Sequence, residues 1–157
     1  MEEEISLISY DEEDKNHCLV VRQMLEDSKV EDRTGSLIQN VLYGEEEAFL
    51  IAVGDKVVGA IDFNLYKSLC YVSLRFASNY RYHGYGTKAL DYVKDYVFEQ
   101  YSDALGISLR IESDNDASIK SAINAGYEKV ETQDKKNVRY DYTRESHYNT
   151  NNKSSSK

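Results

Sequence analysis

Two glycines lie where a predicted apolar strand leads through a loop into the start of a predicted amphipathic helix, where a ligand could contact the backbone. The strand covers residues 70–76, the glycines are Gly84 and Gly86, and the helix covers residues 84–100. Glycine lets the backbone approach a ligand closely, and the first turn of a helix has N–H groups without an intrahelical acceptor. These donors favour an anion such as phosphate or pyrophosphate, to which Arg81 could add a charge-assisted hydrogen bond. A simple glycine turn without a ligand is the alternative.

Two common nucleotide-binding loops do not fit this segment. A P-loop needs Gly-x-x-x-x-Gly-Lys-Ser/Thr, and no such run occurs. A dinucleotide-binding fingerprint needs Gly-x-Gly-x-x-Gly, but residue 89 is Ala and the required acidic residue at the end of a second strand is missing. The loop instead has the pattern Arg/Gln-x-x-Gly-x-Gly/Ala, formed by Arg81, Gly84 and Gly86.

This pattern resembles the acetyl-CoA-binding loop of the GNAT superfamily of N-acetyltransferases. A second segment, residues 109–127, looks like another part of that family. There, Asn115 and Ser118 match an Asn-x-x-Ser pattern, and Gly126 and Tyr127 match a Gly-Phe/Tyr pair. The two patterns occur in the order that the family has, and the resemblance extends over nearly all of residues 5–143.

The periodicity of the apolar residues predicts the elements that position these motifs. Strands are expected at residues 5–10, 48–53, 56–63, 70–76, 107–111, 127–130 and 137–142, and helices at 12–28, 36–43, 84–100 and 115–125. The order β-α-α-β-β-β-α-β-α-β-β indicates a mixed α/β (α+β) protein with one βαβ crossover. The resemblance implies the GNAT fold, a central, mostly antiparallel twisted sheet of 6–7 strands with about four helices. Residues 1–145 are expected to form one domain, and residues 146–157, which have low complexity, a disordered tail.

The resemblance also implies how acetyl-CoA, as cosubstrate, would bind. Backbone N–H groups of residues 82–87 would hold the pyrophosphate, supported by Arg81. Phe76 and Ser78 would pair with the pantetheine arm, and an N–H there would stabilise the oxyanion of the thioester. Asn115 would bond the pantetheine amide. The predicted cofactor-binding residues are Phe76, Ser78, Arg81, Tyr82, His83, Gly84, Tyr85, Gly86, Thr87 and Asn115.

The family's chemistry is direct attack of a neutral amine on the thioester, which needs a base and an acid for the leaving thiolate. The acid is commonly a Tyr seven residues after the Asn, but this chain has Ala122 there. The catalytic residues are therefore left unassigned, with Glu112, Ser73 and Tyr127 as candidates; Arg75 is a poor base because it is positively charged. A non-catalytic CoA-binding or regulatory module is the alternative function, and a plain interaction domain is a third.

Length and charge limit the remaining possibilities. The 157 residues fit one domain, and a net charge of −9 argues against a general binder of nucleic acid or of anionic membranes. Residues 1–50 carry a net charge of −10 and residues 51–157 of +1, which suggests a cationic acceptor. A small-molecule or peptide amine is the expected partner, and family members often form homodimers. Without a signal sequence or a long apolar run, a cytoplasmic protein is expected. Cys18 and Cys70 are expected to be reduced, largely buried thiols, and no metal is expected.

Overall fold

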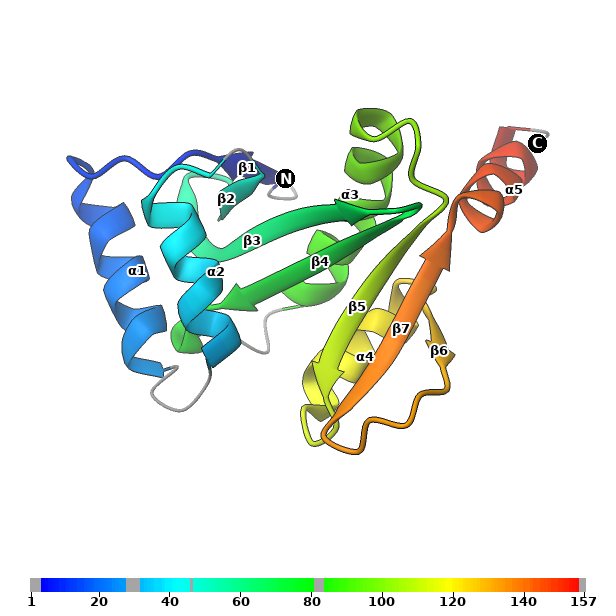
Figure 1. The fold of residues 1–157 in the computed structure, drawn as a ribbon. Coiled ribbons are helices and arrows are strands. Elements are labelled where there is room, and N and C mark those ends of the chain that lie inside the picture. Colours follow the sequence, from blue (N-terminus) through cyan, green and yellow to red (C-terminus); the bar gives the residue numbers. More distant parts are fainter. Residues whose placement is uncertain (1–3, 28–31, 46, 81–83, 156–157) are drawn as a thin grey trace. The chain divides into compact units, whose positions relative to one another are not determined.

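The strands form a sheet whose hydrogen-bonded order is β1-β2-β3-β4-β5-β7-β6 in the computed structural model (Figure 1). The structure describes residues 4–27, 32–45, 47–80 and 84–155. β1 pairs antiparallel with β2, β2 with β3, β5 with β7 and β6 with β7, whereas β4 pairs parallel with β5. The predicted mixed, mostly antiparallel sheet is confirmed. The strands are β1 (Ile5–Ile8), β2 (Ala48–Val53), β3 (Lys56–Tyr66), β4 (Leu69–Phe76), β5 (Gly106–Glu112), β6 (Glu128–Val130) and β7 (Asn137–Thr143).

The helices also follow the predicted order. They are α1 (Lys15–Asp27), α2 (Asp32–Leu42), the short 3₁₀ helix η1 (Ser78–Tyr80), α3 (Tyr85–Gln100), α4 (Asp116–Asn124) and α5 (Arg144–Ser155). α2 begins before the predicted residue 36. The sequence pattern missed this start because residues 32–36 are Asp-Arg-Thr-Gly-Ser and have no apolar spacing that could mark a helical turn. α5 occupies the segment where a disordered tail is expected.

The chain divides into two compact units, and each is described by itself. Unit 1 comprises Met1–Phe63 and Ser73–Tyr85, and unit 2 comprises Asn64–Val72 and Gly86–Lys157. The sequence pattern predicts one domain and does not show this division, because the boundaries fall within β3 and β4.

In unit 1, α1 and α2 lie side by side and cover one face of the neighbouring strands (Figure 1). Val20, Val21 and Met24 recur at helical spacing on α1, and they are buried in the same cluster as Ile38 of α2 and Leu50 of β2. Full burial of such a side chain contributes about 1.5–3 kcal/mol. The turn between β2 and β3 has Gly54 at φ +61°, in agreement with the hairpin predicted at Gly54-Asp55.

In unit 2, α3 and α4 are joined through polar contacts in the core. The Lys94 Nζ of α3 donates to the Ala125 carbonyl at the end of α4 (2.8 Å) and lies over the Tyr142 ring. α4 ends where the sequence predicts, since Gly126 has φ +87° and stops the helix.

α5 is attached to α3 through its first residue. The Arg144 guanidinium donates to the carbonyls of Ala104 (2.6 Å), Tyr101 (2.9 Å) and Phe98, and it also lies over the Phe98 ring. These carbonyls are among the last of α3 and the residues after it, so they lack intrahelical partners. Composition alone could not indicate this anchor, which depends on a single arginine outside the low-complexity segment.

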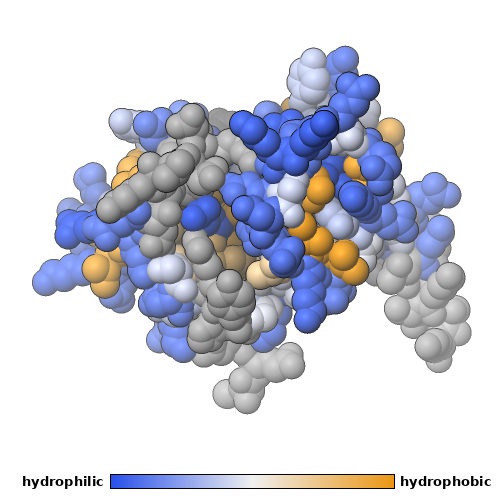
Figure 2. Space-filling view, turned by 90° about the horizontal axis from the view of Figure 1, so that it is seen from below, coloured by the Kyte–Doolittle hydropathy of each residue, from blue (hydrophilic) through white to orange (hydrophobic). Residues whose placement is uncertain are grey.

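Among the described residues on the face shown in Figure 2, most are hydrophilic, with hydrophobic residues in small groups. Exposed hydrophobic side chains are ordinary on a protein surface. Among the described residues, no helix is both long and apolar enough to span a membrane.

Candidate functional site

At the end of β4, successive backbone N–H groups point to opposite edges of the strand. The Ala77 N–H donates to the Val58 carbonyl of β3 (2.9 Å). Because successive N–H groups of a strand point to opposite edges, the N–H of Phe76 points away from β3. The backbones of β3 and β4 approach so closely here that a Cβ on Gly59 would clash with the Arg75 carbonyl, so only glycine fits. The Phe76 N–H is therefore directed to the edge where the resemblance places pantetheine.

Ser78 begins the short helix η1 that follows β4. Its hydroxyl accepts a hydrogen bond from the Gln23 Nε2 of α1 (3.1 Å), and the residue is exposed. The Tyr80 N–H donates to the Ala77 carbonyl (2.9 Å) and closes the turn. Ser78 thus lies in unit 1 beside α1, with its side chain accessible from solvent.

The glycine loop leads directly into α3. Gly84 has φ +79°, a left-handed conformation that residues with a Cβ rarely adopt, and α3 begins at the next residue, Tyr85. The N–H groups of Tyr85, Gly86, Thr87 and Lys88 are the first four of the helix and therefore have no intrahelical acceptor. The first turn contains no acidic residue, so no carboxylate of that turn offsets the positive end of the helix dipole.

Three predicted cofactor residues, Arg81, Tyr82 and His83, lie outside the described residues.

Asn115 is the N-cap of α4, in unit 2. Its Oδ1 accepts a hydrogen bond from the Ser118 N–H (3.2 Å), which explains the Asn-x-x-Ser spacing as a helix start. The Nδ2 of the same exposed side chain can donate to pantetheine, and the second lone pair of Oδ1 can accept a further hydrogen bond.

Two residues near the expected acid position are buried in unit 2. Ala122 on α4 has an exposed fraction of 0%. The Tyr127 side chain is also buried, and its hydroxyl donates to the Leu90 carbonyl of α3 (3.1 Å). Burial, followed by the nearby charge of Asp91, raises the pKa of Tyr127 well above its ordinary value. This environment favours a packing role for Tyr127 over that of an acid at a thiolate.

The candidate bases fall in different units. Glu112 ends β5 in unit 2 and is half-buried opposite Asn137 of β7. Ser73 lies on β4 in unit 1 and is exposed. Arg75 is half-buried on the same strand, two residues further along.

Sequence reasoning missed one acidic residue. The half-buried Asp62 of β3 accepts a hydrogen bond from Asn40 Nδ2 of α2 (3.0 Å) and further bonds from the hydroxyl and the N–H of Ser73. Burial raises the pKa of Asp62, although the donors Asn40 and Ser73 oppose this shift. The available signal was a carboxylate within the otherwise apolar run Val57–Phe63.

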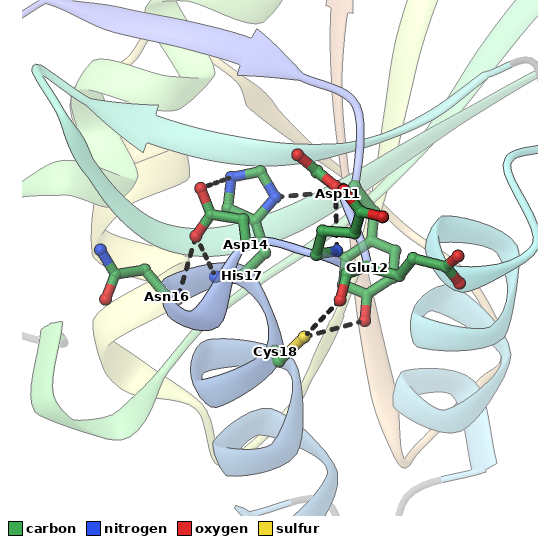
Figure 3. A network of polar contacts seen from close by, with 8 residues as sticks. Asp11, Glu12, Asp14, Asn16, His17 and Cys18 are labelled. Atoms are coloured by element: carbon green, nitrogen blue, oxygen red, sulfur yellow. Dashed lines mark hydrogen bonds and ion pairs between the residues drawn. The ribbon is translucent and has the colours of Figure 1, made fainter.

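A polar network around the start of α1 (Figure 3) has a structural role. The Asp14 carboxylate caps the helix by accepting the N–H groups of Asn16 (2.8 Å) and His17 (3.2 Å). His17 Nδ1 accepts from the Asp11 N–H (3.0 Å), and the Cys18 thiol donates to the Glu12 carbonyl (3.3 Å). Neither Cys18 nor Cys70, both among the described residues, forms a disulfide; Cys70 is buried as predicted, while Cys18 is only half-buried. In the part of the chain that the structure describes, no group of three or more His, Cys, Asp and Glu side chains could hold a metal.

The fold is similar to several solved acetyltransferases. One is a GNAT acetyltransferase from Bacillus anthracis, with a TM-score of 0.69, 16% identity, and coverage of 92% of this chain and 98% of that one. A second is the N-acetyltransferase PseH of Campylobacter jejuni in complex with acetyl coenzyme A, with a TM-score of 0.65, 16% identity, and coverage of 89% and 99%. A third is the aminoglycoside acetyltransferase AAC(6')-Ib in complex with coenzyme A and kanamycin, with a TM-score of 0.69, 15% identity, and coverage of 94% and 98%.

At these low identities, the similarity to solved structures shows only the fold. The family assignment rests instead on a match of the sequence to a family model. A comparison with curated proteins found no match. A family model described as the acetyltransferase (GNAT) family matches residues 9–127, which include the glycine loop and α4. This match covers more than half of the chain, and so the chain belongs to the GNAT family of acetyltransferases.

Proposed function

We propose that the protein is an acetyl-CoA-dependent N-acetyltransferase that moves an acetyl group to a primary amine by direct attack. The observation that carries this proposal is the left-handed Gly84, φ +79°, immediately before the N-terminus of α3. Such a helix start suits the pyrophosphate of coenzyme A. Family membership supports the same chemistry.

Different residues would then bind different parts of acetyl-CoA. The N–H groups at the start of α3, from Tyr85 to Thr87, would bind the pyrophosphate, with Arg81, Tyr82 and His83 completing the loop. Phe76 and Ser78 would bind pantetheine, and Asn115 would bond its amide. The Phe76 N–H would stabilise the negative charge that develops on the thioester oxygen as the amine attacks.

A cationic small-molecule or peptide amine is the proposed acceptor. Residues 1–50, which include α1 and α2, carry a net charge of −10, and such a surface attracts cations. A structural relative is known in complex with kanamycin, an acceptor of this charge class.

The buried Ala122 favours a second candidate, a non-catalytic CoA-binding or regulatory module. The family's usual hydroxyl is missing at this position, and a Tyr there would have to displace core neighbours, since Ala122 has no exposed surface. In an Ala122→Tyr variant, overpacking of the core would therefore lower the stability at the same time as the new hydroxyl could raise the activity. Turnover by the wild-type protein distinguishes the two candidates directly.

Thermal unfolding with and without acetyl-CoA tests the binding step. At about 100 times its dissociation constant, a ligand stabilises the folded protein by about 2.7 kcal/mol. A Gly84→Ala variant should bind acetyl-CoA roughly 5–30-fold more weakly, because a left-handed alanine costs about 1–2 kcal/mol. Gly44→Ala is the matched control, since Gly44 has φ +67°, has open space around it and lies outside the loop. Equal losses of affinity in both variants, or no stabilisation of the wild type, would contradict the proposed site.

A further inference from the structure

Asp62 lies on the face of unit 1 that α1 and α2 cover, and donors from two other elements hold its carboxylate. Asn40 of α2 donates to one oxygen, Oδ2, over 3.0 Å. Ser73 of β4 donates through both its hydroxyl and its N–H. The carboxylate is half-buried, whereas Ser73 is exposed. A half-buried carboxylate is thus in contact with an exposed serine hydroxyl.

The surroundings of Asp62 explain why it would accept a proton. The ladder neighbour on β2 is Ala48, preceded by the partly exposed Glu47, and the groups that contact the carboxylate from α2 and β4 are the neutral Asn40 and Ser73. Among the described residues, burial is the main influence, and it raises the pKa of Asp62. Because burial disfavours the ionised form, the folded protein holds a proton on Asp62 more readily than the unfolded chain does.

Ser73 also lies on the strand that would bind the thioester. It precedes Phe76 by three positions on β4, which corresponds to roughly 10 Å along a strand. That distance leaves room for the thioester, the attacking amine and one bridging water.

We propose that Ser73 takes the proton from the attacking amine, directly or through one water, and passes its own hydroxyl proton to Asp62, which Asn40 holds in position. The inference rests on the proposed acetyl transfer and assigns its proton acceptor. The nitrogen of the neutral amine forms a bond to the thioester carbon, the C–S bond breaks, and the electron pair leaves with the thiolate of coenzyme A. The amine proton replaces the hydroxyl proton of Ser73, and Asp62 later releases the transferred proton to solvent. Ser73 is then the catalytic residue, and Asp62 and Asn40 are positioning residues.

The test is acetyl transfer from acetyl-CoA to spermidine, tyramine, kanamycin and a lysine peptide, followed as a function of pH. Ser73→Ala and Asp62→Asn should each lower kcat by about 100-fold with little change in KM, as for the loss of general base catalysis. The double variant should be no worse than either single one, because the two residues act as one unit. Ser73→Thr keeps the hydroxyl and should restore most of the activity. Ser68→Ala and Asp55→Asn, at exposed turn positions, are the matched controls and should behave like the wild type.

The pH profile separates this role from a structural one. In the wild type, kcat should fall at low pH as Asp62 becomes protonated, and Asp62→Asn should remove this decrease. Asn40→Ala removes a donor to the carboxylate, so it should raise the pKa further and move the decrease to higher pH. Thermal unfolding of Asp62→Asn should show no loss of stability near neutral pH, because the ionised form is the one that burial disfavours.

The outcomes are distinguishable. If the wild type acetylates a panel amine while Asp62→Asn keeps both its kcat and its low-pH decrease, the relay is overturned and the acetyltransferase proposal stands. If losses from Ser73→Ala and Asp62→Asn multiply in the double variant, the two residues act separately and the relay is also overturned. If acetyl-CoA stabilises the wild type but no amine is acetylated, the proposed function fails and the relay fails with it.

Discussion

Tyr127 and Asp62 are both polar side chains withdrawn from solvent, but their partners differ. The Tyr127 hydroxyl donates to a backbone carbonyl, that of Leu90, inside unit 2. Asp62 instead contacts an exposed serine hydroxyl. A buried hydroxyl that is hydrogen-bonded to a backbone carbonyl contributes to stability. A carboxylate that is hydrogen-bonded to an exposed hydroxyl can also exchange protons with solvent.

Tyr127→Phe should therefore lower the free energy of unfolding by about 1 kcal/mol, the usual contribution of one buried hydrogen bond, and leave kcat unchanged. Urea unfolding and steady-state kinetics measure the two effects. A fall in kcat of more than tenfold without a loss of stability would instead identify Tyr127 as the general acid.

Residue types alone indicate part of the proposed site. The glycines and Asn115 were recognisable because they stand at local structural transitions, a helix start in each case. Asp62 and Ser73 are adjacent only because β3 and β4 pair, and no local pattern marks Asn40 as their third partner. Such clusters depend on tertiary contacts, so they cannot be predicted from the residue pattern of a single sequence.

At the scale of elements, periodicity predicted the order of strands and helices because each element buries one face. Periodicity does not mark the start of α2 or the residues of α5, where apolar side chains are few. α2 begins within a polar segment, and α5 continues from Arg144 into residues of low complexity. Apolar spacing says nothing about a helix whose attachment is one guanidinium.

Arg144→Ala should lower the free energy of unfolding by about 2–3 kcal/mol, because it removes charge-assisted hydrogen bonds to the carbonyls at the end of α3. Lys129→Ala, an exposed change on β6, serves as the control and should alter stability by less than about 0.5 kcal/mol. Urea unfolding followed by circular dichroism compares the two. Equal stability of both variants would show that the Arg144 contacts are not made in solution.

At the scale of the whole molecule, the charge is divided along the chain. The net charge of residues 1–50 is −10, while the rest, which contains the glycine loop and α4, has +1. A nearly neutral region is compatible with a polyanionic cofactor, and an acidic one with a cationic acceptor. The total of −9 conceals this difference.

If the acidic part attracts the acceptor, kcat/KM for spermidine should fall several-fold as NaCl rises from 0.05 to 0.5 M, because salt screens exposed charges. A neutral amine acceptor such as aniline, measured over the same range, should change far less. Neutral or acidic amines that are turned over better than spermidine at low salt would contradict a cationic acceptor.

Acetyl transfer by the purified wild-type protein decides whether the protein is an N-acetyltransferase. The protein is mixed with acetyl-CoA and the amine panel, and the release of coenzyme A and the mass of the product are both measured. We expect stoichiometric coenzyme A release and an acetylated amine for at least one cationic acceptor. Tight binding of acetyl-CoA without acetylation of any amine would contradict it and favour the non-catalytic module.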